Sequence, residues 1–104
     1  MDAQAIPWRT TRHPGTSIHF YASDRRSGRT VALIRMDPGC GYPRHRHQGR
    51  EEVLVLQGSY RDEQGVHTAG SFVTYENGTT HAPIAGDTQC ILLAIAHEGI
   101  TLLS

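Results

Sequence analysis

The chain contains no lysine among its 104 residues, and its ten arginines are balanced by ten acidic side chains. The absence of lysine excludes every mechanism that passes through a lysine Schiff base. A formal net charge of zero provides no excess of positive charge to attract nucleic acid or an anionic membrane surface. We therefore expect neither nucleic acid nor a membrane among the partners of this protein.

Long hydrophobic runs are also missing, because no stretch approaches the roughly 20 apolar residues that a membrane span requires. The N-terminal stretch MDAQAIPWRTTRH lacks the basic start and apolar core of a secretory signal peptide. We therefore expect a cytoplasmic protein in which the two cysteines, Cys40 and Cys90, are reduced. The sequence does not decide whether the fold brings these two cysteines together.

Helical patterns are also missing from the sequence, since no apolar periodicity typical of a helix extends over ten residues or more. Instead, eleven glycines and five prolines separate short apolar runs that are rich in β-branched, aromatic or leucine residues. The clearest of these runs lie at residues 30–36, 52–57, 71–75 and 90–96. The last run is also compatible with a helix, but its neighbours favour a strand. Many short strands at near-regular spacing predict an all-β sandwich or barrel.

The runs at 52–57 and 90–96 are apolar on both faces, whereas a strand with one solvated face would alternate. In the first run, Val53 and Val55 share the parity expected for the barrel interior, and Leu54 and Leu56 point the other way. An opposite sheet or a second subunit must cover that other face, and we expect a homodimer. No linker or internal repeat divides the sequence, so we expect a single domain over residues 1–104.

Two histidines stand one residue apart in the string RHRHQGREE. Because side chains two residues apart in a strand project to the same face, His45 and His47 can converge on one metal ion. Glu51 has the same parity but would lie about 20 Å from His45 in a straight strand. It can join the histidines only if the chain turns back, and Gly49 is the residue that tolerates such a turn. A solvated surface loop would explain the same short string without any metal.

A fourth metal ligand has to come from elsewhere in the chain. His81 is the best placed of the remaining histidines, because it follows a turn-forming Asn-Gly pair just after the run at 71–75. Three imidazoles and one carboxylate suit zinc, iron, manganese, nickel or copper without selecting among them. A five- or six-coordinate ion would keep positions open for water, substrate or dioxygen.

The segment GCGYPRHRHQGREEVLVLQG, residues 39–58, resembles the first motif of the cupin superfamily at every motif position. The segment GSFVTYENGTTHAPIA, residues 70–85, is similar to the second cupin motif and matches it in part. Glu76 stands where that pattern has proline, and Ala85 stands where it has asparagine. These departures concern the turn and the residues after the ligand, whereas His81 itself matches.

The cupin resemblance covers roughly residues 30–97 and implies a double-stranded β-helix, which is a jelly-roll barrel. Carried over residue by residue, it implies that His45, His47, Glu51 and His81 are the ligands of one divalent transition metal. Iron, zinc, manganese and nickel are the candidate ions, with iron and zinc foremost. A small organic molecule is the expected ligand or substrate.

A narrower resemblance covers residues 51–83, which look like the cupin domain of ChrR-type proteins. In the founding members, this domain is the C-terminal module of zinc-binding anti-sigma factors. The same segment is similar to small single-domain cupins that resemble acetylacetone and dihydroxyacetophenone dioxygenases. The sequence shows no N-terminal module with a Cys-x-x-Cys zinc motif, so we do not expect direct inhibition of a sigma factor.

Three functional hypotheses follow from these resemblances. The first is a non-haem metal-dependent dioxygenase-type oxidoreductase that acts on a small organic molecule. The second is a non-catalytic, ChrR-like regulatory module that senses zinc or a ligand. The third is a metal-free sugar isomerase on the same barrel, against which the intact ligand set argues. The sequence does not separate the first two hypotheses, and a shared fold does not decide the chemistry.

Other polar side chains have weaker signals. Glu52 is expected to face outward and pair with an arginine, because its parity is opposite to that of Glu51. Cys40 is either a redox-sensitive thiol near the mouth of the site or a small loop residue, and Cys90 is expected in the core. His97 is either a hydrogen-bond partner near the metal or an exposed side chain. Candidate substrate contacts are Tyr42, Tyr75 and Arg35, and no role is assigned to His13, His19 and His67.

Overall fold

The computed structural model of the protein describes residues 2–98 and 100–102, and the side chains of residues 2–98. Within these residues the chain forms one short 3₁₀ helix and twelve strands. No helix in this part of the chain has the length and apolar character needed to cross a bilayer. The elements are η1 (Ala3–Ala5), β1 (Arg9–Thr10), β2 (Thr16–Ser23), β3 (Thr30–Met36), β4 (His45–His47), β5 (Glu51–Gln57), β6 (Ser59–Asp62), β7 (Gly65–Thr68), β8 (Phe72–Tyr75), β9 (Thr80–His81), β10 (Ile84–Ala85), β11 (Cys90–Ala96) and β12 (Ile100–Leu102).

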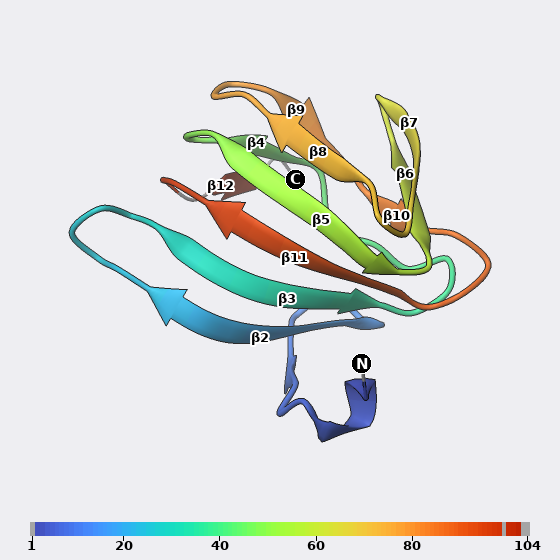
Figure 1. The fold of residues 1–104 in the computed structure, drawn as a ribbon. Helices are drawn as coiled ribbons and strands as arrows, with labels where there is room; N and C mark the ends of the chain where they lie inside the picture. Colours follow the sequence, from blue (N-terminus) through green and yellow to red (C-terminus); the bar gives the residue numbers. More distant parts are fainter. Residues whose placement is uncertain (1, 99, 103–104) are drawn as a thin grey trace.

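The strands form three antiparallel sheets. The largest has the order β1-β2-β3-β11-β5-β8, and the two smaller ones have the orders β10-β6-β7 and β12-β4-β9. In Figure 1 the large sheet runs across the front, with β4, β9 and β12 towards the back and β6, β7 and β10 at the right-hand end. Neighbours in the large sheet are far apart in sequence, as β11 between β3 and β5 shows. The predicted all-β jelly-roll fold is confirmed.

The strand predictions are confirmed where the sequence is most apolar. The runs at 30–36 and 90–96 coincide with β3 and β11, and the other two runs match β5 and β8 to within one residue. The run at 90–96 is therefore a strand and not a helix. It is a central strand between β3 and β5. Its two faces are apolar because Leu92 and Ala94 on one face belong to the core and Ile91 on the other face is also buried.

Side-chain parity along β5 agrees with the prediction. Val53 and Val55 are buried in the core, whereas Leu54 is half-buried and Leu56 is 38% exposed. The core combines these valines with side chains from β3, β6, β8, β10 and β11. Its members are Met36, Val53, Val55, Tyr60, Val73, Tyr75, Ala85, Cys90, Leu92 and Ala94.

The N-terminal segment packs against the large sheet through Trp8. The indole nitrogen of Trp8 donates a hydrogen bond to the carbonyl oxygen of Ala3 at 2.8 Å. The guanidinium carbon of Arg35 lies 4.7 Å from the centre of the Trp8 ring, a cation–π contact. Arg35 therefore lies on the outer side of β3, opposite in parity to the buried Ala32 and Met36. Part of the outer face is thus covered by this chain itself.

Two glycines of the motif segment serve different purposes. The chain turns between β4 and β5 at Gly49, as predicted, but Gly49 is not among the glycines with a positive φ. A Cβ atom there would lie 3.0 Å from the Cβ of Glu98, so the missing side chain gives room for packing. Gly58 has a φ of +72°, and a Cβ there would lie 2.2 Å from the carbonyl oxygen of Gln89. Both backbone conformation and space therefore require glycine at position 58.

Candidate metal centre

The four predicted metal ligands come from three strands that the fold brings together. His45 and His47 are buried at either end of β4, and Arg46 between them is exposed. His81 lies on β9 directly opposite His45 in the antiparallel register. Glu51 is the first residue of β5, immediately after the turn that follows β4. The alternation of β4 and the turn behind it thus place three of the four side chains as the spacing predicts.

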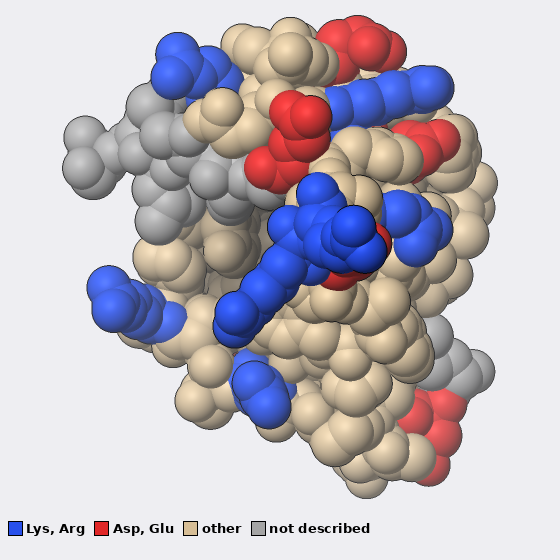
Figure 2. All heavy atoms as spheres, turned by 90° about the vertical axis from the view of Figure 1, so that its left-hand side faces the viewer, with Lys and Arg blue, Asp and Glu red and all other residues tan. Residues whose placement is uncertain are grey.

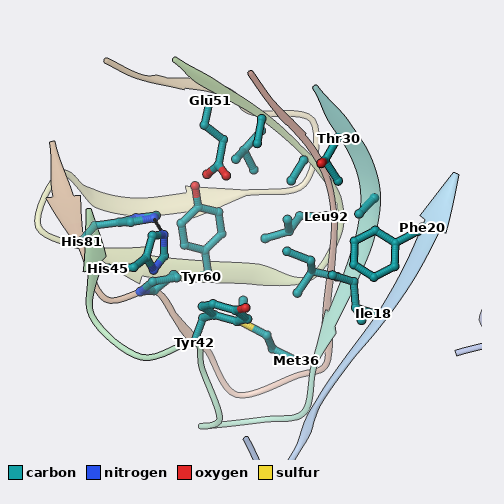
Figure 3. Close-up of a pocket in the computed structure, with 16 residues that line it drawn as sticks. Ile18, Phe20, Thr30, Met36, Tyr42, His45, Glu51, Tyr60, His81 and Leu92 are labelled. Carbon is teal, nitrogen blue, oxygen red and sulfur yellow. Dashed lines mark hydrogen bonds between the residues drawn. The ribbon is translucent and has the colours of Figure 1, made fainter. Parts of the chain in front are cut away.

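The ligand atoms of these four residues face one another at short distances. One ring nitrogen or carboxylate oxygen from each residue lies within 4.8 Å of the others. The Nε2 atoms of His45 and His81 are 2.9 Å apart, and Nε2 of His47 is 3.2 Å from Oε1 of Glu51. Figure 3 shows Glu51, His45 and His81 approaching one end of a cavity. The cluster could therefore hold a metal ion.

The other ring nitrogen of each histidine is occupied by an acceptor. Nδ1 of His45 donates to the carbonyl oxygen of Pro43 at 2.9 Å, and Nδ1 of His81 donates to Oδ2 of Asp62 at 2.8 Å. Nδ1 of His47 lies 3.2 Å from the carbonyl oxygen of Thr79. The carbonyl of Pro43 and the carboxylate of Asp62 can only accept, so in His45 and His81 the proton sits on Nδ1 and Nε2 presents its lone pair to the cluster.

Burial favours the neutral forms of His45 and His81. Desolvation lowers the pKa of His45 to about 4, and desolvation is also the largest cause of the lowered pKa of His81. With both Nδ1 protons donated outward, the two Nε2 lone pairs face each other at 2.9 Å and cannot form a hydrogen bond. A cation between them would accept both lone pairs, and each metal–nitrogen bond would measure about 2.0–2.1 Å. The donor set therefore fits a transition metal ion.

Asp62, at the end of β6, is the central acceptor behind the cluster. Its side chain is fully buried, and its two oxygens accept hydrogen bonds from four donors. Oδ2 accepts from His81 and from the hydroxyl of Tyr75, and Oδ1 accepts from Nε2 of His67 at 2.9 Å and from the amide of Gln64 at 3.0 Å. Burial alone would raise the pKa of Asp62, but the hydrogen bonds from Tyr75, His81 and His67 outweigh it and lower that pKa.

Sequence reasoning missed Asp62 because it belongs to the string DEQG, which reads as a turn. Asp62 does accept from the amide of Gln64 in that turn, so the turn signal is genuine but incomplete. His67, to which no role was assigned, contacts this buried carboxylate. Tyr75 does not line the cavity. Its hydroxyl donates to Asp62 and accepts from the hydroxyl of Tyr60 at 2.6 Å. No single-sequence signal predicts these pairings between separate strands.

Three weaker expectations need correction or refinement. Glu52 pairs with Nε2 of His97 at 3.2 Å, not with an arginine, so His97 is no partner of the metal ligands. Arg35 stacks on Trp8 and does not line the cavity. Both cysteines are free. Cys90 belongs to the core as expected, and burial raises the pKa of its thiol to about 11.

A cavity of about 200 Å³ adjoins the cluster. His45, Glu51 and His81 form one end of it, and apolar side chains from β2, β3, β5 and β11 form most of the wall. Figure 3 shows Ile18 and Phe20 on the far side from the histidines, with Leu92 between. Tyr42 also lines the cavity, and burial, reinforced by the negative charge of Glu51, raises the pKa of its hydroxyl.

The outer surface near the β4–β5 turn carries both signs of charge. Figure 2 shows arginine side chains (blue) and acidic side chains (red) sharing the face at the left of Figure 1. One ion pair of the described residues joins Arg50, after β4, to Glu76, after β8, at 3.9 Å. This mixture agrees with the zero net charge of the chain.

Comparison with known proteins identifies the family. The anti-sigma-E factor ChrR of Cereibacter sphaeroides is 38% identical over 69 residues, which are 64% of this chain and 32% of that protein. The chain thus spans about a third of that curated relative. A crystal structure of Rhodobacter sphaeroides SigE in complex with the anti-sigma ChrR matches with a TM-score of 0.81 and 29% identity, over 90% of this chain and 51% of that one.

An RmlC-like cupin protein from Ralstonia eutropha JMP134 matches with a TM-score of 0.87 and 26% identity, over 99% of this chain and 70% of that one. These matches agree with the jelly-roll fold. The family model of the ChrR cupin-like domain matches residues 1–100. The chain therefore belongs to the ChrR cupin-like domain family.

Proposed function

We propose that His45, His47, Glu51 and His81 bind one divalent transition metal, and that the protein is a dioxygenase-type oxidoreductase acting on a small organic molecule. The observation that carries this proposal is the cavity of about 200 Å³ that opens directly onto three of the four proposed ligands, His45, Glu51 and His81. A purely structural metal site would be closed by protein atoms, whereas this one has space for a ligand beside it. In this proposal residues 1–104 form one functional domain.

The metal, when bound, would supply the redox chemistry and the open coordination positions. The chain supplies a ligand set of three neutral imidazoles and one carboxylate, which leaves a divalent ion with a net charge near +1. It also supplies an apolar wall that excludes water from most of the cavity. Asp62 accepts a hydrogen bond from Nδ1 of His81, which keeps the proton on that nitrogen and leaves Nε2 free for the metal.

Oxygen consumption tests this proposal. The protein would be loaded anaerobically with iron(II) and mixed with a panel of small enolisable carbonyl compounds and catechols while dissolved oxygen is recorded. We expect oxygen uptake that requires both iron and one class of these compounds, and that is lost in Glu51→Gln. The matched control is Glu52→Gln, because Glu52 is the next residue on β5 but bonds to His97 outside the cluster. Oxygen uptake that persists in Glu51→Gln contradicts the proposal. So does the absence of oxygen uptake by the iron-loaded unmodified protein with every compound of the panel.

A regulatory module is the second candidate, and family membership is the observation that favours it. The match of residues 1–100 is to the ChrR cupin-like domain, and the curated relative is an anti-sigma factor. Under this candidate the site binds zinc, and a ligand in the cavity changes the conformation rather than reacting. Zinc in the purified protein, together with no oxygen uptake after iron loading, would favour this function over the oxidoreductase.

A further inference from the structure

The cavity beside the four residues contains almost no charge. Its wall consists mainly of aliphatic and aromatic side chains, and no arginine or aspartate is among the described residues that line it. Glu51 is the one carboxylate in that lining, and imidazoles that bind a metal are neutral. With a divalent ion in place, the cavity therefore has a net charge of about +1 and nothing to balance more than one negative charge.

Tyr42 supplies a hydrogen-bond donor that has no partner among the described residues. Its ring meets the ring of His45 edge-on, with centroids 5.4 Å apart and an interplanar angle of 89°. In Figure 3 the Tyr42 ring lies between His45 and Met36. Its hydroxyl makes no hydrogen bond to any described residue. The hydroxyl of Tyr60, by contrast, is engaged by Tyr75 at 2.6 Å, so Tyr42 offers the free donor next to the ligand histidines.

The volume and the lining determine which occupants fit. A cavity of about 200 Å³ is many times larger than the space that one water molecule needs, so it has room for a small organic molecule. Placing a second negative charge against Met36, Ile34 and Leu92 would leave that charge without a partner in apolar surroundings. The lack of a partner for a second negative charge therefore argues against polyanions such as dicarboxylates and phosphates.

We infer that the cavity binds a small monoanionic chelator, whose apolar body lies against β3 and β11 and whose oxygen accepts a hydrogen bond from the Tyr42 hydroxyl. This inference rests on the proposed metal centre and adds the chemical class of its ligand. It assigns Tyr42 as a residue that positions the ligand. It holds equally for a substrate that reacts and for an effector that is only sensed, because both use the same cavity.

A matched pair of 2-oxo acids tests the inference. The probes are 2-oxopentanoate and 2-oxoglutarate, which share one chelating head and differ in that a terminal carboxylate replaces a methyl group. Zinc-loaded protein, in which no turnover occurs, would be titrated with each probe by calorimetry at pH 7, and zinc retention would be measured after each titration. We expect 2-oxopentanoate to bind at least tenfold more tightly than 2-oxoglutarate. Equal or tighter binding of the dianion, or no binding of the monoanion, overturns the inference.

Tyr42→Phe tests the role of the hydroxyl. We expect this variant to bind 2-oxopentanoate about tenfold more weakly and to bind zinc as the unmodified protein does. The matched control is Tyr21→Phe, because Tyr21 is 58% exposed and does not line the cavity, and its affinity for the probe should be unchanged. Unaltered probe affinity in Tyr42→Phe overturns the assignment of Tyr42 while the metal centre stands. Failure of the unmodified protein to bind zinc would instead remove the metal centre and this inference with it.

Discussion

Replacing Asp62 by asparagine should weaken metal binding without touching a metal ligand. The carboxylate of Asp62 accepts from four donors, two at each oxygen. An asparagine amide has one oxygen, so it can accept from only one of these two pairs, and its NH₂ group would face the other. If the NH₂ group faces His81, that ring must move its proton to Nε2 to accept from the amide. The tautomer with Nε2 protonated cannot bind a metal through that atom.

The expected size of the effect follows from the two lost hydrogen bonds. Each hydrogen bond to a charged group contributes about 1.5–3 kcal/mol, so Asp62→Asn should lower the free energy of unfolding by about 3–6 kcal/mol. Loss of a hydrogen-bond partner of a ligating histidine lowers metal affinity by about 10–100-fold. We therefore expect the variant to bind zinc 10–100 times more weakly. The stability loss should be larger in the presence of zinc than in the metal-free protein, because weaker zinc binding by the folded state adds to it.

Competition with a chromophoric chelator measures the zinc affinity, and urea unfolding measures the stability. The matched control is Glu63→Gln. The neighbouring Glu63 is exposed, pairs with Arg44 at 2.6 Å and accepts a hydrogen bond from the amide of Ala82 at 3.2 Å, and such an exposed ion pair should contribute less than about 1 kcal/mol. Zinc binding by Asp62→Asn equal to that of the control would refute the reasoning, since His81 would then keep its orientation without the carboxylate. The cobalt(II) absorption spectrum provides an independent readout, which should change in Asp62→Asn and not in Glu63→Gln.

Three further predictions concern stability, each measurable by urea unfolding. The pKa of His45 is lowered from 6.5 to about 4, so between these pH values the unfolded metal-free chain binds more protons than the folded chain. The free energy of unfolding should therefore fall by about 3 kcal/mol as the pH drops from 6.5 to 4. A stability that does not change over this interval would contradict this prediction. Gly58→Ala should lower the free energy of unfolding by about 2 kcal/mol or more. The loss should be smaller for Gly39→Ala, because Gly39 has nearly the same φ but open space where its Cβ would lie. Equal losses in the two variants would show that the contact with Gln89 is unimportant. Tyr75→Phe should cost about 1–3 kcal/mol by leaving the buried Tyr60 hydroxyl without its partner, and an unchanged midpoint would argue against that hydrogen bond.

The sequence predicts the parts of this protein whose signals are local. Strands β3 and β11 are predictable because buried central strands consist almost wholly of apolar residues. The three side chains of the His45–Glu51 segment are predictable in position because strand alternation and one turn determine them. His81 required the cupin motif as well, since it joins the cluster through the pairing of β4 with β9.

The remaining features depend on contacts between distant segments. Strand β2 is eight residues long but mixes polar and apolar positions, and Tyr21 and the other residues at the C-terminal end of the strand are exposed. The alternation of apolar and polar residues along this strand is therefore weak. The convergence of Asp62 with Tyr75 and His81 arises from three separate strands. Trp8 packs on Arg35 and covers part of the outer face of the large sheet. From the sequence, we expected this face to be covered by an opposite sheet or by a second subunit. Homodimer formation stays a prediction, and Phe72, which is 60% exposed on the edge strand β8, is where it could be probed.

Metal content is the measurement that tests the central claim most directly. The protein would be purified without chelators or metal-affinity columns and analysed by inductively coupled plasma mass spectrometry, beside His81→Ala and the Glu52→Gln control. We predict about one equivalent of iron or zinc per chain in the unmodified protein and in Glu52→Gln, and a loss of most of it in His81→Ala. No bound metal in the unmodified protein after reconstitution, or full occupancy in His81→Ala, would contradict the proposed four-ligand centre.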